Sequence, residues 1–90
     1  MGLFDDISVG DRRGQVKLWS SQMYSYKKGS VVPELPEGPM DYSIVMREGG
    51  YVNVSKENKI LSWTDEPQFT AVLDKYGSPF SEDSGYFFER

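Results

Sequence analysis

The sequence contains no cysteine and no histidine among its 90 residues. Without cysteine there is no disulfide, no thiolate nucleophile and no sign of an oxidising compartment. Without histidine the chain lacks the usual general base near neutral pH, the Ser-His-Asp arrangement and the common zinc sites. These two absences predict a non-enzymatic protein that uses no metal and no cofactor.

Long apolar runs are also missing. No segment approaches the length of a membrane-spanning helix, and no signal-peptide pattern opens the chain. We therefore expect a cytoplasmic protein without membrane contact. The length fits a single domain over residues 1–90, in which we expect residues 1–13 and 81–85 to be irregular or mobile.

Positive charge is scarce in the last third of the chain. Residues 1–64 hold eight acids and eight bases, whereas residues 65–90 hold six acids and two bases, which accounts for the net charge of −4. Nucleic-acid binding depends on clustered Lys and Arg, so this balance argues against it. An acidic end of the chain is typical of a solvated surface or of a patch that steers a basic partner.

Residues 41–63 are rich in β-branched and aromatic side chains, and they predict three antiparallel strands joined by two tight turns. At the first turn, Gly49-Gly50 supplies the positive φ of a two-residue loop. That loop would pair Val45 with Val54.

A two-residue loop at Glu57-Asn58 would form the second turn and pair Val52 with Trp63. It would also place Lys56 opposite Lys59, an unfavourable pair of like charges. A three-residue loop with Asn58 in the left-handed region avoids that pair but turns over the third strand. The two-residue loops place one apolar set on a single face: Val45, Val52, Val54, Leu61 and Trp63.

Two further strands are indicated before the central meander. Apolar and polar residues alternate over residues 15–19 and again over 23–27, and the polar residues 20–22 suit a hairpin loop between them.

The pattern of a helix follows the meander over residues 66–76. Asp65 is suited to cap it, Gly77 to end it, and the apolar residues between them recur at helical spacing. We therefore predict an α+β fold, mainly β: an antiparallel sheet of about five strands with one helix packed across it. A barrel-like curl of the sheet is an alternative.

Aromatic and charged side chains suggest two kinds of binding surface. Tyr and Trp are enriched at protein interfaces, and acidic residues steer basic partners. An interaction surface would therefore use Trp19, Tyr24, Tyr26, Tyr51, Glu82 and Asp83. Contacts to an anion would come from Arg12, Arg13, Lys17 and Arg47.

We expect a small acidic protein-interaction domain, of the kind found in inhibitors or immunity proteins. Two alternatives remain open from the residues alone. One is a module that binds a small anionic ligand through basic and aromatic side chains. The other is a structural homodimer whose mixed sheet face is covered by a second copy of the chain.

Three short motifs resemble a pattern in small bacterial and phage proteins of uncharacterised function. They are Gln15-Val16-Lys17, the Tyr26–Gly29 turn that precedes Val32-Pro33, and Asp74-Lys75-Tyr76-Gly77. Ser30 stands where those proteins more often have an acid, and Tyr76 where they more often have Trp. The resemblance implies a bacterial or phage origin and a small β-rich domain, and it implies no activity.

Overall fold

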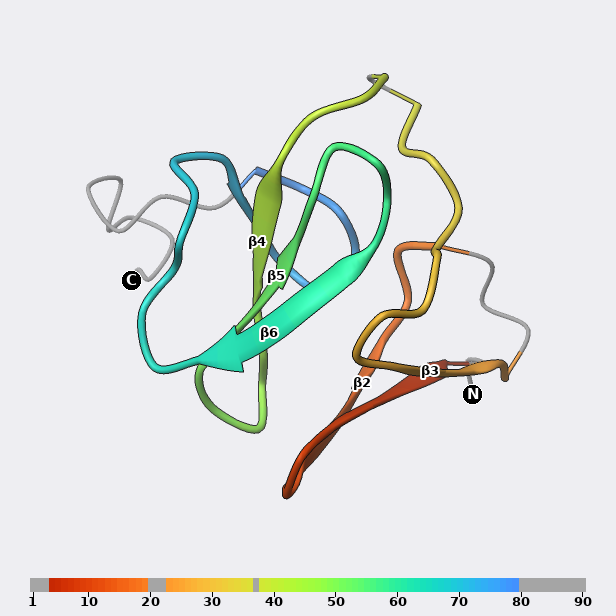
Figure 1. The fold of residues 1–90 in the computed structure, drawn as a ribbon, viewed down its shortest axis with the longest axis vertical. Helices are drawn as coiled ribbons and strands as arrows, with labels where there is room; N and C mark the ends of the chain where they lie inside the picture. Colours follow the sequence, from red (N-terminus) through yellow and green to blue (C-terminus); the bar gives the residue numbers. More distant parts are fainter. Residues whose placement is uncertain (1–3, 20–22, 37, 80–90) are drawn as a thin grey trace.

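A computed structural model describes residues 4–19, 23–36 and 38–79 of the chain (Figure 1). These residues form two β-sheets and contain no helix. The first sheet has the strand order β2-β1-β3, and the second has the order β6-β5-β4-β7. The strands are β1 (Asp5–Val9), β2 (Arg12–Val16), β3 (Ser25–Lys27), β4 (Tyr42–Val45), β5 (Tyr51–Val54), β6 (Ile60–Thr64) and β7 (Val72–Leu73).

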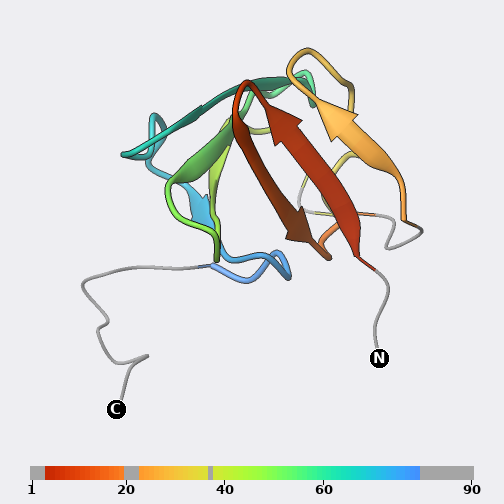
Figure 2. The same cartoon turned by 90° about the horizontal axis from the view of Figure 1, so that it is seen from below.

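The first sheet is built on a hairpin that lies earlier in the chain than predicted. Val9 pairs with Arg12, so Gly10 and Asp11 form a two-residue turn, with Gly10 at a φ of 61°. Strand β1 therefore occupies part of the segment 1–13 that we expected to be irregular. The predicted hairpin between residues 15–19 and 23–27 is wrong, because β3 pairs in parallel with β1 instead (Figure 2).

The meander of β4, β5 and β6 exists, but its first turn is longer than predicted. Val45 pairs with Tyr51, not with Val54, and the amide of Met46 donates to the carbonyl of Gly50. The loop therefore has three residues, 47–49, and its last residue, Gly49, has a φ of 112°. A glycine with positive φ ends the loop as such hairpins require, but the length differs.

The second turn follows the three-residue alternative, with Asn58 in the left-handed region at a φ of 66°. The amide of Ser55 donates to the carbonyl of Lys59, so Lys56 does not face Lys59. A bulge at Leu61 then restores the register, and Val52 pairs with Trp63 as predicted. Leu61 was predicted to share the apolar face, and the bulge instead leaves it exposed.

The predicted helix over residues 66–76 is wrong: this segment is irregular except for the short strand β7. One face of the second sheet is polar, and segment 65–71 lies across it. The amide of Phe69 donates to the hydroxyl of Ser43, and the amide of Ser43 donates to the carbonyl of Ala71. These bonds to the sheet take the place of helical ones, and β7 completes the edge of β4 in parallel.

Asn53 is the centre of this polar face and is fully buried. Its side-chain oxygen accepts from the Ser43 hydroxyl at 2.6 Å and from the Gln68 amide at 3.1 Å. Its amide nitrogen donates to the hydroxyls of Ser62 and Thr64 at 3.0 and 2.9 Å. Because an Asn side chain has two donors and two acceptor sites, Asn53 has no hydrogen-bonding capacity left over.

The opposite face of the second sheet packs against the inner face of the first. Along β4 and β5 its buried apolar residues alternate with the residues of the polar face, as a sheet with two different environments requires. The buried apolar core consists of Ile7, Val16, Tyr26, Val32, Leu35, Tyr42, Ile44, Met46, Val52, Val54, Ile60, Trp63 and Leu73. The sheets form two packed layers and not a closed barrel (Figure 2).

Two glycines allow the sheets to approach closely. A Cβ atom on Gly14 of β2 would meet the side chains of Glu48 and Met46 within 3 Å. A Cβ atom on Gly50 would meet the guanidinium of Arg12 and, at 2.8 Å, the indole nitrogen of Trp63. The β4–β5 connection and β2 are therefore in contact beside Gly14 and Gly50, which have no side chain.

Candidate binding surfaces

Trp19 and Tyr26, predicted as interaction residues, are largely part of the core. Tyr26 is buried, and the half-buried Trp19 meets it edge to face at a centroid distance of 5.0 Å. The indole N–H of Trp19 donates to the hydroxyl of Tyr42 at 3.1 Å. Burial raises the pKa of the Tyr42 hydroxyl from 10.0 to about 12, although the Trp19 bond acts in the opposite direction.

Tyr24 is different, because the residue is 53% exposed while hydrogen bonds hold its backbone on both sides. Its amide donates to the carboxylate of the fully buried Asp5 at 3.0 Å. Its carbonyl accepts from the amide of Asp6 at 2.8 Å. The ring also rests edge to face on Tyr26, at a centroid distance of 6.3 Å. Tyr24 is thus an exposed aromatic side chain on a rigid support.

Met23 precedes Tyr24 and is the more exposed of the two, at 67%. Its backbone has a φ of 66°, a left-handed conformation that is uncommon for a residue other than glycine, asparagine or aspartate. Such conformations persist only where the surroundings hold them, and they are frequent at binding sites. We refer to Met23 and Tyr24 together as the Tyr24 patch.

The other predicted interaction residues do not join this patch. Tyr51 lies in β5 of the second sheet, where it is half-buried and pairs with Val45 and Thr64. Glu82 and Asp83 lie outside the described residues. The predicted single aromatic and acidic surface is therefore not assembled within the part of the chain that the structure describes.

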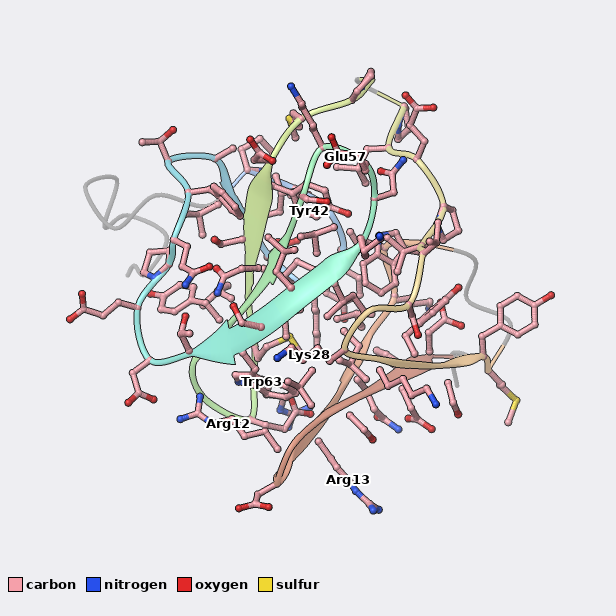
Figure 3. The ribbon with its side chains drawn as sticks, viewed as in Figure 1. Arg12, Arg13, Lys28, Tyr42, Glu57 and Trp63 are labelled. Carbon is pink, nitrogen blue, oxygen red and sulfur yellow. The ribbon has the colours of Figure 1, made fainter. Side chains whose placement is uncertain are left out.

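Of the four cations predicted to contact an anion, Arg12 and Arg13 border one pocket, whereas Lys17 and Arg47 lie elsewhere. Arg12 forms an ion pair with Asp65 at 2.6 Å and borders a pocket of about 350 Å³ beside Trp63. Lys17 lies over the ring of Phe4, 5.5 Å from its centroid, and Arg47 borders a different pocket next to Tyr76. Figure 3 shows Arg12 beside Trp63, whereas the side chain of Arg13, which also borders that pocket, extends outward.

Arg13 instead lies on the outer face of the first sheet. The register pairs Ser8 of β1 with Arg13 of β2 on one side and with Lys27 of β3 on the other. The next row on this face consists of Ser25, Asp6 and Gln15, in which the Gln15 amide donates to Asp6 at 3.2 Å.

A depression of about 470 Å³ covers part of this outer face, and Ser8, Arg13, Gln15 and Ser25 are among the residues that line it. Sequence reasoning missed Ser8 and Lys27, because only the parallel pairing of β3 with β1 brings Lys27 to this face. Paired residues on neighbouring strands share a face, so the signal lies in the pairing and not in any local motif.

Comparison with protein-family models, with curated proteins and with solved structures found no significant match. Within residues 4–19, 23–36 and 38–79, no three Asp or Glu side chains lie close enough together to hold a metal ion. In the same ranges no helix is long and apolar enough to cross a membrane.

Proposed function

We propose that the protein is a small non-enzymatic domain that binds another protein through the Tyr24 patch. The observation that supports this most directly is the fixed backbone of Tyr24 beneath an exposed ring. Residues that dominate binding energy at interfaces are often Tyr, Trp or Arg, and they act best when little side-chain freedom is lost on binding.

The partner would offer an apolar pocket or groove to this patch. Met23 supplies a flexible apolar side chain and Tyr24 a rigid ring, and both are exposed just before the start of β3. Met is common at surfaces that adapt to several shapes, and Tyr adds a hydroxyl that can donate to the partner. The half-buried Trp19 and the buried Tyr26 act from behind as the rigid base of the patch.

Affinity capture with a matched pair of variants tests this proposal. Tyr24→Ser removes the ring, whereas Tyr76→Ser removes a ring of similar exposure (56%) on the turn that follows β7. We expect one dominant protein to be retained by the wild type and by the Tyr76 variant and lost by the Tyr24 variant. A partner that all three forms retain, or that both variants lose, would contradict the role of the patch.

The mass of the protein in solution distinguishes a homodimer from a complex with another protein. If the Tyr24 patch joins two copies of the chain, sedimentation will show a dimer for the wild type and a monomer for Tyr24→Ser. If the wild type is a monomer at all concentrations and captures no protein, the result would argue against both a protein partner and a homodimer at the Tyr24 patch.

The narrower assignment to an inhibitor or immunity protein depends on the acidic end of the chain. It predicts that charge reversal at Glu82 and Asp83 slows association with the partner, and slows it more at low salt. An association rate that does not change would remove the acidic residues from the proposal and leave the Tyr24 patch in place. The cytoplasmic location expected from the cysteine-free sequence remains part of the proposal.

A further inference from the structure

We infer that the outer face of the first sheet binds a phosphate group between Arg13 and Lys27, above Ser8. We call these three residues the phosphate row. They lie side by side on three adjacent strands, with the two cations on either side of the serine. This site uses a different face from the Tyr24 patch and does not depend on the proposed protein partner.

The spacing of the row suits one small anion. Neighbouring strands are about 4.8 Å apart, so the backbones of Arg13 and Lys27 are about 10 Å apart. Both side chains are long enough to converge above the central strand. Ser8 lies beneath that point and can donate its hydroxyl to an oxygen held between the two cations.

Neither cation is already committed to an acid. Within the described residues Arg13 has no ion-pair partner, in contrast to Arg12, which is paired with Asp65. Lys27 also has no ion-pair partner among the described residues, and it is exposed. The carboxylate of Asp6, which is the nearest acid on this face, accepts a hydrogen bond from Gln15 in the adjacent row.

The charges favour a phosphate group over a carboxylate. Two cations match the charge of about −2 that a phosphate monoester carries near neutral pH. Arg offers several N–H donors and Lys three more, which suits the three terminal oxygens of a phosphate. The depression of about 470 Å³, which Ser8 and Arg13 line and Lys27 does not, is of the size that small-molecule ligands occupy.

The surroundings favour a small ligand over a polyanion. Asp6 and Asp11 lie on the same hairpin as Arg13, and the chain carries a net charge of −4. A nucleic-acid backbone that continued past the phosphate row would meet these acids, and repulsion would oppose its binding. A single phosphate, free or at the end of a metabolite, meets fewer of these acids, although Asp6 lines the same depression as Arg13.

Amide NMR titration of the full-length chain at constant ionic strength tests the site. The ligands are inorganic phosphate and glycerol 2-phosphate, with chloride as the control anion. We expect saturable shifts of the amides of Ser8, Arg13 and Lys27. If both ligands bind, the site accepts a phosphate on a metabolite; if only inorganic phosphate binds, the free ion is the ligand.

Two variants and two controls decide whether the row is responsible. Arg13→Gln and Lys27→Gln should each weaken binding about tenfold, because each removes a charge-assisted hydrogen bond. Arg12→Gln and Lys28→Gln remove the same charge from the adjacent residue in the chain and should change the affinity by less than about twofold. Shifts that do not saturate, or an equal loss in all four variants, would overturn the inference.

Discussion

Replacement of Gly50 by Ala should destabilise the protein more than the same replacement at Gly49. Both glycines have positive φ, 112° at Gly49 and 76° at Gly50, so both replacements strain the backbone. Their surroundings differ, because a Cβ atom at Gly49 meets nothing within 4 Å. A Cβ atom at Gly50 would lie 2.8 Å from the carbonyl oxygen of Thr64 and 2.8 Å from the indole nitrogen of Trp63.

The magnitude follows from two terms. A left-handed conformation costs an L-residue about 1 to 2 kcal/mol, and this term applies to both variants. Overpacking adds about 1 to 3 kcal/mol at Gly50 only, since the Thr64 carbonyl is backbone and Trp63 donates to the Gly49 carbonyl. The lower entropy of an unfolded chain with Ala in place of Gly offsets about 0.4 to 1 kcal/mol in both cases. Gly50→Ala should therefore be the less stable variant by about 1 to 3 kcal/mol.

Urea denaturation followed by tryptophan fluorescence measures this difference. With an m-value of about 1 to 3 kcal/mol per molar, the two midpoints should differ by about 0.3 M or more. Gly10→Ala is a further control, because Gly10 has a φ of 61° and an open surrounding. Equal midpoints for the Gly49 and Gly50 variants would refute the close contact between Gly50 and β6.

Three other perturbations have expected outcomes. Asn53→Asp keeps the shape of the side chain but removes both N–H donors to Ser62 and Thr64, and should cost about 1 to 3 kcal/mol or more of stability in the same urea assay. The raised pKa of Tyr42 means that its contribution to stability is complete below pH 10.0 and is lost as the pH rises through about 12; the loss, up to about 3 kcal/mol, should be absent in Tyr42→Phe. Asp65→Asn removes the exposed ion pair with Arg12 and should cost less than about 1 kcal/mol, an amount that salt reduces further.

Each of these expectations has an outcome that contradicts it. A urea midpoint for Asn53→Asp equal to that of the wild type would count against the two bonds that the Asn53 amide donates. An alkaline transition that Tyr42→Phe leaves in place would assign it to another group. A large loss in Asp65→Asn would mean that the ion pair is less screened than its exposure indicates.

The β-rich character and the central meander could be predicted from sequence, whereas the details of its turns could not. The pairing of Val52 with Trp63 is found in the structure, although the prediction reached it through loops of the wrong length. A three-residue loop turned the third strand over, and the bulge at Leu61 turned it back. The extra residue in the loop and the extra residue in the bulge cancelled each other's effect on which face each side chain occupies. Local strand propensity contains no signal for either feature.

The helix was predicted wrongly because its amphipathic pattern is a local signal. The hydrogen bonds that segment 65–71 makes instead are to residues far away in the sequence. Segment 65–71 finds hydrogen-bond partners in Ser43 and Asn53, which lie on strands that precede it in the chain. A residue such as Asn53 has low strand propensity, and only the assembled sheet makes it the centre of a polar network. The candidate phosphate row was hidden for the same reason, since Lys27 reaches it through a parallel pairing.

The two parallel pairings also affect the order in which the chain can fold. The β1–β2 hairpin and the meander of β4, β5 and β6 each form between neighbours in sequence, so little loop entropy opposes them. Strands β3 and β7 pair with β1 and β4 only after longer connections have closed. These two strands should therefore join late, which places the support of the Tyr24 patch among the last parts of the domain to be completed.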